Sequence, residues 1–299
     1  MARALMGEDL PTIDGPEDER LLNDLSGCLL LSDRSRELTV FLLDRMDKQV
    51  LRLEEKPIHH SAVSPAGEML YCWSGQTRYG LRVVTFGEAT EHVLLTREGL
   101  LDPESKIVLA PDGQHIAFLF RVFFSSAQLR PTWQLEILDV DGTSRVVVVA
   151  EASMGGPRWY PDSYRLAFPS PSGLGVLDIR TGEVEVLGIV RAGDPCVREG
   201  GDSLLVTNRG QASVVDGGGA PVPVNLPGLL FAATAWLKDG RVIYEGLPTS
   251  GQEQRYNGAF QAWPTRYWTI KIANPRTGAF ATIVPYFGFG SCVYSDRSP

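Results

Sequence analysis

Residues 110–118 read Ala110-Pro111-Asp112-Gly113-Gln114-His115-Ile116-Ala117-Phe118, a tight polar turn that leads into an apolar strand. Turns of this kind, each preceded by an apolar stretch, recur along the chain. A period of about 40 to 50 residues built on strands is typical of a propeller, because one small sheet cannot bury both of its faces alone. The six turns are Ser64-Pro65-Ala66-Gly67, Ala110-Pro111-Asp112-Gly113, Tyr160-Pro161-Asp162-Ser163, Arg198-Glu199-Gly200-Gly201, Leu237-Lys238-Asp239-Gly240 and Tyr294-Ser295-Asp296-Arg297.

The second half of each repeat predicts a hairpin of two further strands. Residues 134–139, for example, alternate between polar and apolar side chains, which is the period of a strand and not of a helix. Each unit therefore predicts four strands, named A to D in order, with the polar turn between A and B. The expected C and D strands are 38–44 with 49–53, 81–86 with 92–95, 135–139 with 145–149, 175–178 with 184–187, 212–216 with 222–224, and 267–274 with 280–284.

The two ends of the repeat array complement each other. The first C–D hairpin follows a B-like strand, Cys28–Ser32, without a clear A strand, and the last A strand, Cys292–Ser295, has no B strand after it. If the C-terminal strand completes the N-terminal blade, the ring closes and no sheet edge stays open. The sequence thus predicts an all-β fold, a six-bladed propeller of four-stranded blades. A seven-bladed ring would need a blade that the sequence does not show.

The turn-and-strand motif resembles that of the TolB-like or WD40-like (PD40) propellers, whose repeats carry Ser-Pro-Asp-Gly before an Ile-Ala-Phe strand. Residues 110–118 match this motif best and residues 161–168 next, and the resemblance runs from about residue 26 to the end. It departs in blade 5, where Arg198-Glu199-Gly200-Gly201 replaces the turn, and in blade 6, where the B–C connection is long. The resemblance implies the fold, and roles that are mostly protein or peptide binding with some sugar- or peptide-active enzymes.

Composition sets further bounds on the class of protein. The chain has 299 residues and a net charge of −8, which argues against nonspecific binding to nucleic acid or to anionic membranes. We expect an N-terminal extension at 1–25, partly mobile with a short helix near 16–22, and one propeller domain at 26–299. With no signal peptide or long apolar stretch, we expect a soluble, cytoplasmic monomer. The four cysteines are expected to be small buried hydrophobes.

Catalytic signatures are missing from the sequence. It contains no Gly-x-Ser-x-Gly elbow and no Gly-rich phosphate loop, so an enzyme is disfavoured, no catalytic residue is assigned and no cofactor is expected. His59 and His60 precede the A strand of blade 2, and Asp102 and Glu104 hold the same connection one blade later. Imidazole and carboxylate side chains around the channel would suit a metal, but adjacent histidines usually point apart. These four are weak candidates for a metal site.

Two B–C connections are long and rich in residues that anchor interfaces. One spans 121–133 and the other 247–266, and blade 2 adds a shorter one. B–C and D–A connections leave the same face of a propeller, so these segments share a rim. The alternative is that the aromatic side chains fold back over the blades or lengthen strands B and C. The candidate binding residues are Arg78, Tyr79, Phe123, Phe124, Arg130, Trp133, Arg255, Tyr256, Phe260 and Trp263.

The favoured function is a module that binds a protein or peptide partner through these loops, of which a bacterial interaction or immunity-type protein is one form. The competing hypothesis is a carbohydrate- or peptide-active enzyme, or a small-ligand binder, with its site at the mouth of the central channel. Stoichiometric bound metal would favour the second hypothesis.

Overall fold

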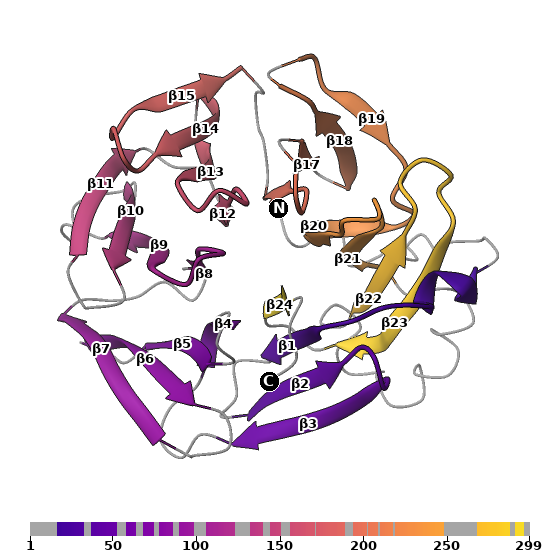
Figure 1. Cartoon of the computed structure of the whole chain (residues 1–299), viewed down its shortest axis with the longest axis horizontal. Helices are drawn as coiled ribbons and strands as arrows, with labels where there is room; N and C mark the ends of the chain where they lie inside the picture. Colours follow the sequence, from indigo (N-terminus) through magenta and orange to yellow (C-terminus); the bar gives the residue numbers. More distant parts are fainter. Residues whose placement is uncertain are drawn as a thin grey trace, which may run out of the picture.

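The structure is a computed structural model, and it forms a closed ring of sheets around a central axis (Figure 1). It describes residues 17–32, 37–52, 58–63, 68–74, 78–85, 90–98, 106–122, 132–139, 144–150, 156–170, 172–188, 194–201, 203–208, 210–217, 219–247, 268–287 and 291–295. These residues build six four-stranded antiparallel sheets, so the predicted six-bladed propeller is confirmed.

In each blade strand A lies nearest the axis and strand D at the rim (Figure 1). Blade 1 holds β24 (Ser291–Ser295), β1 (Cys28–Ser32), β2 (Glu37–Leu42) and β3 (Asp47–Arg52). Blade 2 holds β4 (Ile58–Val63), β5 (Glu68–Ser74), β6 (Arg78–Thr85) and β7 (Thr90–Glu98). Blade 3 holds β8 (Lys106–Leu109), β9 (His115–Val122), β10 (Thr132–Asp139) and β11 (Ser144–Ala150).

The second half of the ring follows the same order. Blade 4 holds β12 (Arg158–Trp159), β13 (Arg165–Ser170), β14 (Gly173–Asp178) and β15 (Val184–Leu187). Blade 5 holds β16 (Pro195–Val197), β17 (Leu204–Asn208), β18 (Gln211–Val215) and β19 (Val222–Val224). Blade 6 holds β20 (Leu229–Trp236), β21 (Val242–Gly246), β22 (Trp268–Ala273) and β23 (Phe280–Phe287).

The predicted ring closure is confirmed by the register of blade 1. Strand β24 pairs antiparallel with β1 over its whole length, from Cys28 opposite Ser295 to Ser32 opposite Ser291. The C-terminal strand is therefore strand A of the blade that the N-terminal part of the chain begins.

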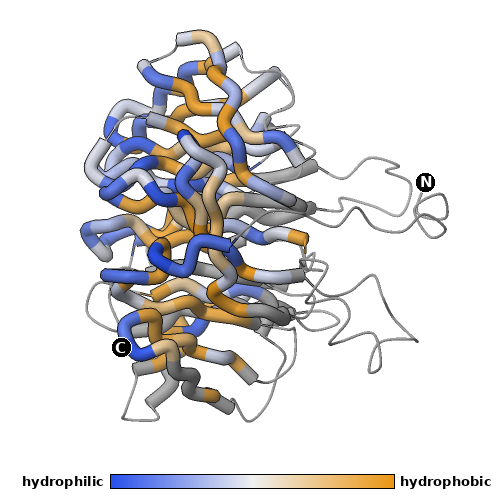
Figure 2. Tube along the Cα trace, turned by 90° about the vertical axis from the view of Figure 1, so that its right-hand side faces the viewer, coloured by the Kyte–Doolittle hydropathy of each residue, from blue (hydrophilic) through white to orange (hydrophobic). Residues whose placement is uncertain are grey.

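The core consists of apolar layers between adjacent blades. One layer joins blade 1 to blade 6 through Leu29 and Leu31 on one side and Ile243, Ile270 and Ile272 on the other. Others lie between blades 2 and 3, 3 and 4, 4 and 5, and 5 and 6. Figure 2 shows the disc from its edge, with apolar segments inside it and hydrophilic segments along the left-hand side.

Two of the four cysteines have described side chains, and both fit the expectation of small buried hydrophobes. Cys28 and Cys196 are buried, and neither forms a disulfide. Burial raises the pKa of the Cys196 thiol to about 11, so this thiol is neutral at ordinary pH.

Before β1 the chain crosses blade 6. A 3-10 helix, η1 (Glu19–Leu22), is capped by the Asp18 side chain, so a short helix forms in the predicted region. Glu17 makes a parallel bridge to Phe280 at the start of β23. We call residues 17–23 the strap. No helix within the described residues is long and apolar enough to span a membrane.

Candidate functional site

Strand order assigns every connection to one of two faces of the disc. The A–B and C–D turns lie on one face, called here the turn face, and the B–C and D–A connections lie on the other, the loop face. The parallel bridge between Arg198 and Trp236 shows that the A strands of blades 5 and 6 run in the same direction. The described ends of β5, β9 and β21 therefore all lead towards the loop face.

Three of the predicted binding residues lie in strands and not in connections. Arg78 and Tyr79 begin β6 and pair with Glu98 and Arg97 of β7. Trp133 lies in β10, opposite Arg121 of β9 and Ala150 of β11. In blades 2 and 3 strand C begins earlier than the sequence indicated, at Arg78 in β6 and at Thr132 in β10, because backbone pairing with the neighbouring strands extends that far.

The remaining candidates cannot be placed on this framework. Phe123, Phe124, Arg130, Arg255, Tyr256, Phe260 and Trp263 lie outside the described residues, as do Asp102 and Glu104. The strands that flank the two long connections, β9 with β10 and β21 with β22, are neighbours in their sheets and end on the loop face.

At the channel, His60 links two blades. Its side chain is buried, and its Nδ1 accepts a hydrogen bond from the backbone N–H of Ile107 in β8 at 3.4 Å. This nitrogen is therefore engaged by the next blade. His59 precedes it in β4, so both histidines lie within strand A and not in the connection before it, where the sequence analysis had put them. No group of three or more potential metal-ligating residues occurs in the part of the chain that the structure describes.

A second link between blades involves Asp194, in the D–A connection just before β16. Its carboxylate accepts a hydrogen bond from the backbone N–H of Gly156, which precedes strand A of blade 4. Its carbonyl accepts one from the Thr207 hydroxyl at 3.3 Å. Like His60, Asp194 ties neighbouring elements together.

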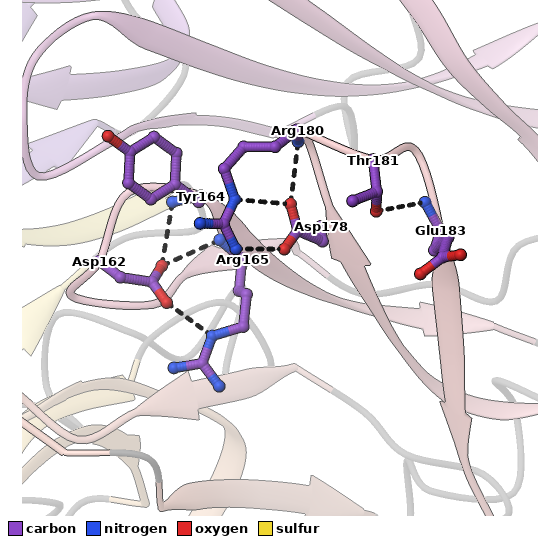
Figure 3. A network of polar contacts seen from close by, with 7 residues as sticks. All are labelled: Asp162, Tyr164, Arg165, Asp178, Arg180, Thr181 and Glu183. Atoms are coloured by element: carbon purple, nitrogen blue, oxygen red, sulfur yellow. Dashed lines mark hydrogen bonds and ion pairs between the residues drawn. The ribbon is translucent and has the colours of Figure 1, made fainter.

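The turn face of blade 4 carries the polar network of Figure 3. Asp162 accepts hydrogen bonds from the backbone N–H groups of Tyr164 and Arg165 and from Arg165 Nε. Burial alone would raise the pKa of Asp162, but these hydrogen bonds hold it below the ordinary value. In the adjacent C–D turn, hydrogen bonds from the Arg180 side chain and backbone lower the pKa of Asp178 to about 2.

Tyr164 stands out on this face as an exposed aromatic side chain. It is 42% exposed, and the Arg180 guanidinium lies 4.8 Å from the centre of its ring. The sequence analysis did not select it, although an aromatic residue in a polar turn could have been a signal. The charged side chains around it form pairs within their own turns, Asp162 with Arg165 and Asp178 with Arg180.

In blade 3, His115 is half-buried. Its Nδ1 lies 2.8 Å from Asp139 Oδ1, and its ring stacks on Trp159 of blade 4 with the centroids 6.2 Å apart. Trp159 in turn donates from Nε1 to the carbonyl of Val108 at 3.1 Å. These contacts join blades 3 and 4 near the axis.

Blade 6 contains a fully buried lysine that the sequence analysis missed. Lys271 lies in β22 between Tyr244 of β21 and Thr282 of β23. Its Nζ is 4.5 Å from the centre of the Phe280 ring and has no hydrogen-bond acceptor among the described residues. Burial lowers the pKa of Lys271 to about 8, while the charge of Glu17 acts in the opposite direction. A lysine inside the apolar stretch 268–273 was the available signal.

Neither a protein family nor a curated protein matches this sequence. Solved structures do match the fold. A chain in the crystal structure of a nidogen/laminin complex has a TM-score of 0.62 at 13% identity, over 91% of this chain and 100% of that one. A putative TolB from Agrobacterium tumefaciens has a TM-score of 0.58 at 14% identity, over 90% and 98%.

Enzymes share the fold as well. An oligogalacturonate lyase in complex with manganese has a TM-score of 0.52 at 13% identity, over 83% of this chain and 70% of that one. At such identities the similarity establishes a propeller and does not transfer an activity.

Proposed function

We propose that this protein is a binding module that holds a protein or peptide partner on its loop face. The proposed contacts are the residues that the sequence selected, with Trp133 near the start of β10, at the loop-face end of blade 3, and Trp263 within the blade 6 connection. We further propose that it is a TolB-like repeat propeller acting as a cytoplasmic monomer. A bacterial interaction or immunity role is one form of this function.

The observation that carries the proposal is the contrast between the two faces. On the turn face, the carboxylates of Asp162, Asp178 and Asp239 are bound to arginines of their own turns. Because these carboxylates already pair within their own turns, they are less available to bind a partner. The longest connections, rich in aromatic side chains and arginine, start and end on the loop face.

The similar structures are compatible with this function. One is part of a nidogen/laminin complex, which is an assembly of two proteins. A closed ring also suits a binding module, because a stiff scaffold loses little conformational freedom when a partner docks.

The test is a comparison of variants with a native-host extract. Full-length W133A and W263A should each lose the partner that the wild type captures, with affinity weakened by about 2 kcal/mol if they are anchors. Y164A, which removes the exposed aromatic side chain of the turn face, is the matched control and should retain the partner. Melting temperatures should differ little between the variants and the wild type.

Two results would contradict the proposal. If W133A and W263A unfold at a clearly lower temperature, these side chains belong to the blades. If Y164A loses the captured protein while W133A and W263A keep it, the partner binds to the turn face.

A further inference from the structure

The strap joins the blade 6 sheet by its backbone and by one carboxylate. The backbone N–H of Asp18 donates to the Phe280 carbonyl at 2.8 Å, next to the bridge made by Glu17. The Thr282 hydroxyl donates to Glu17 Oε1 at 2.6 Å. Extended backbone therefore sits on the outer edge of β23, with an acidic side chain beside the face that holds Lys271.

Lys271 explains why an acidic residue suits this position. Thr282, which holds the Glu17 carboxylate, is the register partner of Lys271, and Phe280, which bridges to Glu17, lies under the Lys271 ammonium. A buried ammonium without an acceptor is costly, and an apolar residue would fill its place at lower cost. The lysine thus gives this edge of the sheet a preference for negative charge.

The rest of the strap makes few buried contacts with the propeller. No residue of η1 is buried, and Leu21 and Leu22 are only partly buried against the layer between blades 6 and 1. One side chain secures the end of the strap: Arg241 Nη1 donates to the carbonyls of Leu21 at 2.6 Å and Asn23 at 2.8 Å. Segments with few buried contacts open at low free-energy cost.

From these contacts we infer that the outer edge of β23 is a binding site for an acidic extended segment of a partner protein. In the free protein the chain's own strap occupies this site. The partner segment would add to the sheet as a strand, as in β-strand addition to an exposed edge. A carboxylate of that segment would replace Glu17 and be selected by Lys271. This site is on the rim of blade 6 and is independent of the loop face.

The proposal can be tested with a fluorescein-labelled peptide that copies residues 14–24. Its binding to full-length wild type, R241A and R241A/K271M is measured by fluorescence anisotropy. The R180A variant is the matched control, because Arg180 forms the same kind of pair with Asp178 that Arg241 forms with Asp239, but does not touch the strap. Hydrogen exchange of residues 17–23 reports whether the strap opens.

In R241A we expect faster exchange of residues 17–23 and at least about ten-fold tighter peptide binding than in the wild type, since the tethered strap competes less well. A peptide with Gln at the Glu17 position should bind R241A about ten-fold more weakly, as expected for a lost charge-assisted contact. R241A/K271M should not distinguish the two peptides, and R180A should behave as the wild type.

Several results would overturn the inference. Unchanged exchange in R241A would show that the strap does not open. Equal affinity of R241A for the Glu and Gln peptides, or retained discrimination in R241A/K271M, would remove the role of Lys271. A dimer of R241A in light scattering would mean that this site binds a second copy of this chain and not a partner's segment.

Discussion

The hydroxyl of Ser163 in the A–B turn of blade 4 accepts a hydrogen bond from the backbone N–H of Asp112 in the A–B turn of blade 3, at 2.9 Å. Ser163 has a φ of 62°, whereas the same turn position in blades 3 and 6 is occupied by Gly113 and Gly240, with φ of 73° and 91°. A left-handed conformation costs a serine about 1 kcal/mol or more. The bond between the blades offsets this cost.

Substitutions at Ser163 should separate these two effects. S163A keeps the backbone strain and loses the hydrogen bond, so we expect a loss of about 1 kcal/mol in the free energy of unfolding. S163G also loses the bond but relieves the strain, so its stability should lie close to that of the wild type. Urea unfolding of the three proteins checks this order. An S163A protein as stable as S163G would show that the strain is negligible.

Ring closure predicts unequal tolerance of the two chain ends. Deleting residues 290–299 removes β24, so β1 loses one of its two neighbours and the blade loses its axial strand. We expect a much larger drop in melting temperature than after deletion of residues 1–14, which leaves the strap and every strand in place. Differential scanning fluorimetry of both truncations provides the comparison, and equal tolerance would contradict closure by β24.

The sequence predicted this architecture well because the repeat encodes local structure. The Pro-Asp-Gly type of turn at 111–113 and the alternation at 134–139 each report the backbone around them, and six copies make the pattern unambiguous. Ring closure was predicted by counting strands, since Cys28–Ser32 had no A strand before it and Cys292–Ser295 had no B strand after it. Both kinds of information are contained in short segments.

Contacts between blades were not predictable in the same way. His60 looked like a metal candidate from its neighbour His59, but its partner is a backbone N–H of Ile107 in the next blade. Trp133 looked like a loop residue, and it pairs within β10 because the strands extend further than the repeat. Lys271 and Glu17 are far apart in the chain, and both are neighbours of β23, Lys271 through Thr282 and Glu17 through Phe280. Such contacts depend on packing between distant segments, which no local pattern records.

The role of His60 as a link between blades leads to a third prediction. H60A leaves the N–H of Ile107, a buried residue, without this acceptor, so stability should fall by about 1 to 3 kcal/mol. H92A, which removes an exposed histidine of β7, is the control and should change stability little. Bound metal is measured in the same preparations by mass spectrometry. Stoichiometric metal in the wild type that disappears in H60A would support the channel-mouth hypothesis instead.

Lys271 leads to the last prediction, which concerns pH. Its pKa is lowered from 10.5 to about 8 in the folded chain. Between these two values the unfolded state binds more protons than the folded state, so the lysine's unfavourable contribution disappears as pH rises through this window. Below pH 8 both states are protonated and the penalty is complete.

K271M removes the titrating group and keeps an apolar stem of similar length. At pH 7 it should be more stable than the wild type by about 3 kcal/mol, given the size of the shift. The difference should shrink as pH rises from 8 to 10.5, because the folded wild type then holds a neutral amine and releasing the proton on folding costs less at each higher pH. Urea unfolding at several pH values measures it, with K238M, at a lysine that is 78% exposed, as the control. A constant difference across this range would mean that the ammonium is solvated or paired.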